Sequence, residues 1–230
     1  MGNRIYPIGI QNFEKIRKEG YVYVDKTALM YKLVKSGSYY FLSRPRRFGK
    51  SLLISTLEAY FEAKRDLFEG LAVETLEKDW VKRPVFHLDL NIGKYDTPDS
   101  LDKILNETLD YWESLYGTRS AETTLALRFA GVVGRAYEQS GERVAILIDE
   151  YDKPLLQAIG NEELQREFRN TLKPFYGVLK TMDGCIKFAL LTGVTKFGKV
   201  SVFSDLNNLN DISMDEPFIC LLYTSPSPRD

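Results

Sequence analysis

Short apolar runs alternate along the chain with longer segments in which apolar residues recur every three or four positions. Four runs are rich in β-branched or aromatic residues, namely 39–43, 85–90, 144–148 and 186–192. Each is too apolar to have one face in water, which is typical of strands buried on both sides in a parallel sheet. These runs therefore predict the strands of a central sheet.

The longer segments carry an apolar stripe at helical spacing, which predicts amphipathic helices. They cover residues 27–36, 51–64, 100–116, 119–140 and 162–182. The last is expected to bend or break at Pro174, because proline removes a backbone donor inside a helix. Strands that alternate with helices predict an α/β fold, a three-layer α/β/α sandwich around a mainly parallel sheet.

Composition adds few constraints and several exclusions. The chain has 230 residues, of which 44% are hydrophobic and 27% charged, as in globular proteins of one domain or slightly more. Its 31 basic and 32 acidic residues give a net charge of −1, which excludes a polyelectrolyte role but leaves a local basic patch open. No apolar run approaches the roughly 20 residues that span a bilayer. We therefore expect a cytoplasmic protein without a membrane partner.

Cysteine and histidine are too few for the chemistry that usually depends on them. Cys185 and Cys220 do not make a disulfide framework, and the single histidine, His87, cannot supply a histidine-based zinc site. His87 lies in an apolar run, so we interpret it as a core or sheet-edge residue.

The segment that carries most chemistry follows the first predicted strand. Gly49-Lys50-Ser51 opens a predicted helix, and a helix N-terminus offers free N–H groups and the positive end of the helix dipole to a phosphate. Gly49 would let the backbone approach the phosphate, Lys50 would reach the β- and γ-phosphates, and the Ser51 hydroxyl would hold Mg²⁺. The residues assigned to nucleotide binding are Arg44, Arg46, Arg47, Phe48, Gly49, Lys50, Ser51 and Leu52.

The loop departs from the usual phosphate-loop pattern at one position. The pattern G-x-x-x-x-G-K-[ST] has glycine where this chain has Arg44. The loop 44–47 is therefore stiffer and more basic than usual, and Arg44 could contact phosphate or face solvent.

Two further strands end in polar residues. Asp149 and Glu150 follow the apolar run 144–148; Asp149 would hold Mg²⁺ with Ser51, and Glu150 would polarise a water for attack on the γ-phosphate. The alternative is a strand that ends in ordinary solvated acids. Thr192, at the end of the run 186–192, is the candidate γ-phosphate sensor, with Thr195 as the alternative and a turn role equally open. Glu150, Lys50 and Thr192 are thus the candidate catalytic residues.

With these motifs, the chain resembles the AAA-ATPase-like family of P-loop proteins over about residues 5–217. The resemblance rests on the segments 8–13, 23–27, 44–51, 148–152, 192–197 and 206–211. It implies a P-loop NTPase sandwich that binds ATP and Mg²⁺, with the acidic-motif strand next to the phosphate-loop strand and arginine at position 44 as a family trait. Family members usually continue into a helical lid and often a nuclease-like domain, neither of which is carried over here.

We expect residues 1–217 to form this P-loop domain without its lid. Residues 218–230, which end in Ser-Pro-Ser-Pro-Arg-Asp, have linker composition and are expected to lie outside the core as a non-native tail of a truncated chain.

The leading hypothesis is Mg²⁺-dependent hydrolysis of ATP to ADP and phosphate, which drives an unknown conformational or remodelling task. The alternative is a nucleotide-gated switch or scaffold with little hydrolysis, as the ATPase part of a longer nuclease-associated protein. A GTPase is a weaker hypothesis: residues 208–211 suggest it, but the lysine that normally follows such an asparagine is missing. Nucleic acid is not indicated, because the phosphate loop already accounts for the arginine cluster. Nucleic acid, homo-oligomers and protein partners stay open.

Overall fold

The computed structural model describes residues 5–195, 209–215, 218 and 221. Its centre is a five-stranded parallel sheet with the order β2-β3-β4-β1-β5. The strands are β1 (Tyr39–Ser43), β2 (Val85–Asp89), β3 (Val144–Asp149), β4 (Ile186–Gly193) and β5 (Asn210–Asp211). The predicted α/β class and parallel sheet are confirmed.

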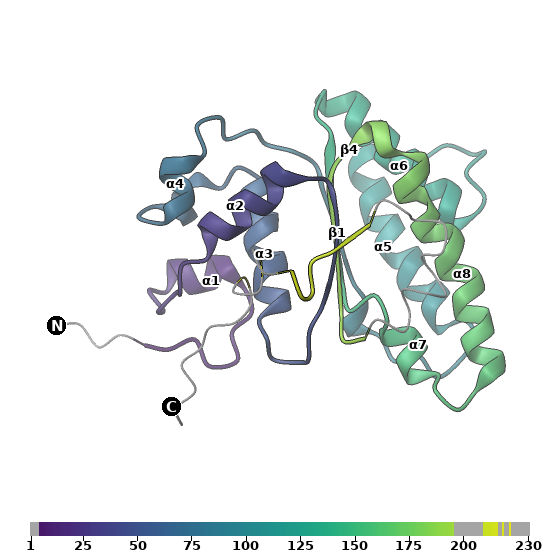
Figure 1. The fold of residues 1–230 in the computed structure, drawn as a ribbon. Helices are drawn as coiled ribbons and strands as arrows, with labels where there is room; N and C mark the ends of the chain where they lie inside the picture. Colours follow the sequence, from purple (N-terminus) through teal and green to yellow (C-terminus); the bar gives the residue numbers. More distant parts are fainter. Residues whose placement is uncertain (1–4, 196–208, 216–217, 219–220, 222–230) are drawn as a thin grey trace.

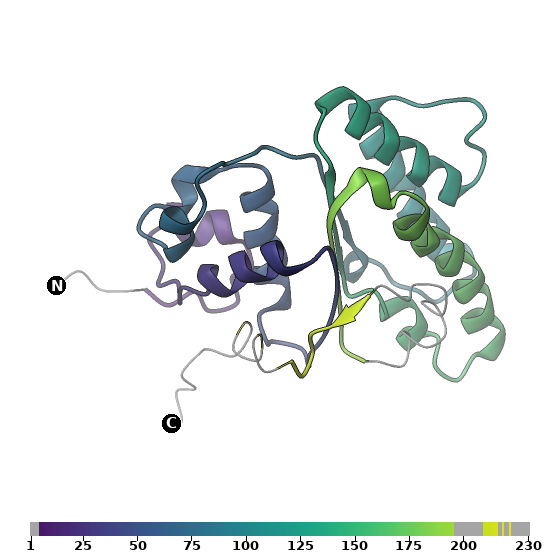
Figure 2. The same cartoon turned by 45° about the horizontal axis from the view of Figure 1, so that its top comes forward.

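Helices cover both faces of the sheet (Figure 1). One layer holds α1 (Phe13–Lys18), α2 (Thr27–Ser36), α3 (Lys50–Phe61) and α4 (Ala72–Leu76). The other holds α5 (Ser100–Tyr116), α6 (Leu125–Ser140), α7 (Lys153–Gln157) and α8 (Glu162–Thr181). The sheet separates the two layers in the turned view as well (Figure 2), so the fold is a three-layer sandwich.

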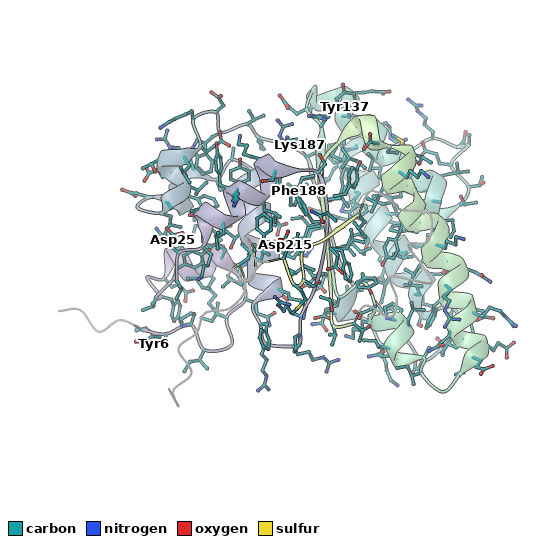
Figure 3. All side chains as sticks on the ribbon, viewed as in Figure 1. Tyr6, Asp25, Tyr137, Lys187, Phe188 and Asp215 are labelled. Carbon is teal, nitrogen blue, oxygen red and sulfur yellow. The ribbon has the colours of Figure 1, made fainter. Side chains whose placement is uncertain are left out.

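Each face of the sheet has its own hydrophobic core. Tyr40 and Leu42 pack toward α2 and α3, whereas Tyr39 and Phe41 pack in the core that α5, α6 and α8 share. Because successive side chains of a strand point to opposite faces, a strand between two cores must be apolar throughout. All six residues of β3 are buried accordingly. Side chains fill the space on both sides of the sheet (Figure 3).

Three helix predictions differ from the structure. The helix expected over 51–64 ends at Phe61, because the chain turns at Ala63, which has a φ of 56°. The helix expected from residue 119 begins at Leu125, because Thr124 is extended and its hydroxyl accepts a hydrogen bond from the Leu127 N–H at 3.3 Å. The break expected at Pro174 does not occur, and α8 runs through it. Leu172 and Phe175 are buried on either side of the proline, and this packing holds the helix together despite the lost hydrogen bond.

The expected strand neighbours are also wrong. We expected the acidic strand β3 beside the phosphate-loop strand β1, but β4 lies between them and pairs with both. The physical reason is the long crossover through α7 and α8, which returns the chain to the sheet between two strands that come earlier in sequence. Thr192, near the end of β4, is thereby placed between the phosphate loop and the acidic pair.

Two residues of the segment beyond position 217 are described, and both are buried. Phe218 and Leu221 pack in the core on the α2 and α3 side, and the Lys32 ammonium lies 5.9 Å from the centre of the Phe218 ring. The division of the chain at residue 217 stays a prediction.

Candidate functional site

The candidate residues converge because β1, β3 and β4 are parallel and end at the same edge of the sheet. Ser43 is the register partner of Gly193, and Ile148 is the partner of Leu191. The phosphate loop leaves this edge from β1, and the acidic pair leaves it from β3. Three segments that are far apart in sequence therefore meet at one place.

The loop between β1 and α3 closes around a lysine side chain. Gly49 precedes α3 with a φ of 82°, a left-handed conformation that glycine adopts without strain. The ammonium of Lys50 donates hydrogen bonds to the backbone oxygens of Arg44, at 3.0 Å, and Pro45, at 3.3 Å. The Arg44 N–H in turn donates to the Gly193 oxygen on β4 at 3.1 Å. The loop is thus anchored to the sheet and to its own lysine.

Lys50 also has an acidic partner. Its Nζ lies 3.2 Å from Oε1 of Glu150, and the two side chains are only 3% and 14% exposed. Burial raises the pKa of Glu150 above its usual value, while the nearby Lys50 ammonium opposes that rise. The Glu150 backbone has a φ of 54°, which is uncommon for a residue other than glycine and occurs mostly in turns and functional sites.

Asp149 joins the phosphate-loop helix to β4. Ser51 Oγ donates to its Oδ2 at 2.6 Å, and the Thr192 hydroxyl donates to its Oδ1. Both Asp149 and Thr192 are buried, at 3% and 0% exposure. The structure therefore brings together Ser51, Asp149 and Thr192 in a single hydrogen-bonded group.

The donor set of this group fits a magnesium ion. Ser51 and Asp149 offer hydroxyl and carboxylate oxygens, which are the hard ligands that Mg²⁺ prefers, and Mg²⁺ usually keeps several waters when it binds to a protein. Within the described ranges, no group of three or more His, Cys, Asp or Glu residues could hold a metal by themselves. The protein ligands alone would thus be few, as in sites where the substrate phosphates complete the coordination.

The other residues that the sequence assigned to nucleotide binding lie next to Gly49, Lys50 and Ser51 in the chain. Arg46 and Arg47 are exposed, and Arg47 has a φ of 69°. Arg44 is half-buried, with its guanidinium 3.5 Å from the sulfur of Met214. Phe48 is half-buried, while Leu52 is partly buried against the α2 and α3 core.

A buried aspartate that the sequence reasoning missed holds the adjoining turn. Asp152 is fully buried and accepts hydrogen bonds from the Thr195 N–H at 2.7 Å and the Thr195 hydroxyl at 2.8 Å. Thr195, the alternative sensor, is therefore committed to Asp152 and not to Asp149. The sequence feature that could have identified Asp152 is its position as a third acidic residue, two positions after Glu150. Gly193 is required at this turn, since a Cβ there would lie 2.4 Å from the Tyr151 ring.

A polar cavity of about 200 Å³ opens beside Ser51 and Asp149. Its other lining residues are Gln11, Asn12, Ser55, Glu58, His87, Asp89 and Asn91. His87 lies on the edge strand β2, as the sequence suggested, and its Nδ1 is 3.3 Å from Glu58 Oε2. Burial lowers the pKa of His87, but the carboxylates of Glu58, Asp89 and Asp149 outweigh burial and raise it overall. The cavity is therefore electronegative.

The sheet order, the loop that enters a helix at Gly49-Lys50-Ser51 and the acidic strand end define a sandwich of the P-loop NTPase type. A family model described as "Predicted AAA-ATPase" matches residues 7–203, so the chain belongs to this AAA-ATPase-like family. It is also 43% identical over 223 residues to a protein from Azotobacter chroococcum mcd 1 described as "Uncharacterized protein in vnfD 5'region". The alignment covers 96% of this chain and 43% of that protein, so the chain spans less than half of its relative's length. No helix in the described part of the chain is long and apolar enough to cross a membrane.

Proposed function

We propose that the chain binds ATP together with Mg²⁺ and hydrolyses it to ADP and phosphate. The observation that carries the proposal is the convergence of Lys50, Ser51, Asp149, Glu150 and Thr192 at one sheet edge beside the phosphate loop. Family membership supports the nucleotide, and the oxygen donors of Ser51 and Asp149 support the metal.

Binding would change the partners of Lys50. In this structure the ammonium is occupied by two loop carbonyls and by Glu150. The β- and γ-phosphates of ATP carry more charge than these groups and would replace them, while the α3 N-terminus adds its free N–H groups. The exposed Arg46 and Arg47 would add positive charge at the mouth of the loop.

Hydrolysis would depend on the release of Glu150. Once the γ-phosphate takes over Lys50, the Glu150 carboxylate is free to accept a proton from a water that attacks the γ-phosphorus in line with the leaving ADP oxygen. Bound Mg²⁺ would neutralise charge on the phosphates. Ser51 and Asp149 would hold it, and Thr192 would keep Asp149 oriented through its hydroxyl.

The alternative function is a nucleotide-gated switch or scaffold with little intrinsic turnover. One observation favours it: Glu150 is paired with Lys50 here, so the candidate base stays occupied until another group takes its place at Lys50. Four further statements are also proposals: that ATP drives a task, that the chain forms a homo-oligomer or binds a protein partner, that it is cytoplasmic, and that it is linked to a nuclease. They remain proposals because the relative extends well beyond this chain. Asn208, from which the GTPase hypothesis began, lies outside the described residues.

The test is calorimetric titration of ATP with Mg²⁺ into the wild-type chain, Lys50→Ala and Lys94→Ala. Lys94 is an exposed lysine paired with Asp96 and serves as the control for loss of one positive charge. Hydrogen bonds to charged groups contribute about 1.5–3 kcal/mol to binding. We therefore expect Lys50→Ala to bind ATP roughly ten- to hundredfold more weakly and Lys94→Ala to bind ATP as the wild type does. Absence of ATP binding by the wild type, or equal binding by Lys50→Ala, would contradict the proposal. GTP titrated in parallel decides between the two nucleotides.

A further inference from the structure

A second carboxylate lies beside Asp149 at the same edge of the sheet. Asp89 is the last residue of β2, Asp149 is the last residue of β3, and the two are register partners in adjacent parallel strands. Both line the polar cavity of about 200 Å³, so their side chains face the same side of the sheet. Neighbouring strands are about 4.8 Å apart, which places the two carboxylates within reach of one hydrated ion.

The two carboxylates differ in how fully they are hydrogen-bonded. Asp149 accepts from Ser51 on one oxygen and from Thr192 on the other. Asp89 accepts from the Asn91 N–H on Oδ1 at 2.7 Å, and among the described residues no hydrogen bond or ion pair reaches its Oδ2. Asp89 therefore has an acceptor available toward the cavity.

The other acid of the cavity is already paired. Glu58 lies on the same face of α3 as Ser51 and Ser55, and its Oε2 is 3.3 Å from His87 Nδ1. Glu58 thus has a side-chain partner in His87, whereas Oδ2 of Asp89 has no such partner among the described residues. Asp89 is thus the carboxylate best placed to interact with a cation at Ser51 and Asp149.

Mg²⁺ held by few protein ligands brings its own waters, and these waters need hydrogen-bond acceptors. The cavity adjoins Ser51 and Asp149, is polar, and is large enough for several ordered waters. We propose that Asp89 is a positioning residue that accepts hydrogen bonds from metal-bound water, so that metal affinity depends on the pair Asp89 and Asp149. The inference rests on the proposed function, because the metal arrives with the nucleotide.

The experiment measures metal and nucleotide binding separately, without turnover. Mn²⁺ is the probe, titrated by electron paramagnetic resonance against the chain saturated with a non-hydrolysable ATP analogue; affinity for the analogue is measured in EDTA. The variants are Asp89→Asn, which keeps the acceptor for the Asn91 N–H and removes the charge, and Asp66→Asn, which removes an exposed charge in the short helix Arg65–Phe68. Thermal unfolding verifies that each variant is folded.

We expect Asp89→Asn to bind Mn²⁺ about tenfold more weakly, as is typical when a residue that supports metal ligands is removed, with its metal-free analogue affinity unchanged. Asp66→Asn should match the wild type, and Asp89→Glu, which restores the charge, should recover part of the affinity. Equal Mn²⁺ affinity in Asp89→Asn and the wild type would overturn the role of Asp89 and leave ATP binding intact. A wild type that binds the analogue neither in EDTA nor in the presence of Mn²⁺ would overturn the proposed function as well. Should Asp89→Asn fail to fold, Asp89→Ser gives the same comparison.

Discussion

The ammonium of Lys50 lies 3.2 Å from the carboxylate of Glu150, and both groups are largely buried. These residues belong to different segments, the start of α3 and the turn after β3, which are a hundred positions apart in the chain. The pair places the candidate phosphate-binding cation and the candidate base in contact with each other. Under the proposed function, nucleotide binding and preparation for catalysis would therefore be coupled through this ion pair.

The variant Glu150→Gln separates these two roles. It removes the negative charge that competes with phosphate for Lys50, so we expect ATP to bind at least as tightly as in the wild type. Loss of the general base predicts a fall in turnover of about 10²- to 10⁴-fold. Calorimetry and a phosphate-release assay measure the two effects. Unchanged turnover would show that Glu150 is not the base, and weaker ATP binding would show that the ion pair does not compete with phosphate.

Thr192→Val tests the hydroxyl that holds Asp149. Valine has nearly the same shape but cannot donate to Asp149 Oδ1, so a buried carboxylate oxygen loses its partner. We expect ATP binding to persist and turnover to fall about ten- to hundredfold, since a hydrogen bond to a charged group contributes roughly 1.5–3 kcal/mol.

Two matched variants control this measurement. Thr192→Ser keeps a hydroxyl and should retain most of the turnover. Thr195→Val removes the hydroxyl that donates to Asp152 and leaves Asp149 untouched. If Thr195→Val lowers the turnover as much as Thr192→Val, the effect belongs to the turn as a whole and not to Asp149.

Gly193→Ala tests the close packing at the end of β4. A Cβ at this position would lie 2.4 Å from a Tyr151 ring carbon and 2.7 Å from an Asp152 oxygen. Overpacking of this kind predicts a loss of about 1–3 kcal/mol in the free energy of unfolding, measured in urea.

Gly177→Ala is the comparison for Gly193→Ala. Gly177 lies inside α8, and an added Cβ would meet no atom within 4 Å. Alanine there should raise the free energy of unfolding by about 0.5–1 kcal/mol, because glycine is the poorer helix former. Equal effects of the two variants would contradict the packing argument.

Glu77→Gln tests a buried carboxylate far along the chain from the candidate site. Glu77 is 6% exposed; it accepts a hydrogen bond from the Tyr60 hydroxyl and lies 3.0 Å from the Lys35 ammonium. Burial alone would raise the pKa of Glu77, but Tyr60 and Lys35 together lower it below its ordinary value of 4.5. We expect the glutamine variant to lose about 1–2 kcal/mol of stability at pH 7, as for a hydrogen-bonded charge with a half-exposed partner.

The pH dependence of that loss follows from the direction of the shift. A carboxylate with a lowered pKa stabilises the folded state above the unfolded-state pKa, and this contribution disappears as the pH falls through the folded-state pKa. The difference between wild type and Glu77→Gln should therefore be full at neutral pH and shrink below about pH 4.5. Urea unfolding between pH 3 and pH 7 measures it, with the exposed Glu107→Gln as control. A difference that does not change with pH would assign the effect to packing.

The sequence by itself determined the four long strands, the longer helices and the strand-to-helix turn at Gly49-Lys50-Ser51. The helices 27–36 and 100–116 and the strand 39–43 were predicted with the bounds that the structure has, because apolar periodicity reports directly which faces are buried. Gly49-Lys50-Ser51 was assigned to a strand-to-helix turn for the same reason. These are local properties, and a window of a dozen residues contains them.

Only the tertiary structure decided which elements are neighbours. Three features depend on crossovers between distant segments. They are the insertion of β4 between β1 and β3, the ion pair of Lys50 with Glu150, and the register pairing of Asp89 with Asp149. Periodicity gives the buried face of a strand but not its place in the sheet, since every interior strand has the same apolar pattern. For this reason Thr192 could be chosen from its strand, whereas Asp89, Glu58 and Asp152 became candidates only when the strand order and register were known.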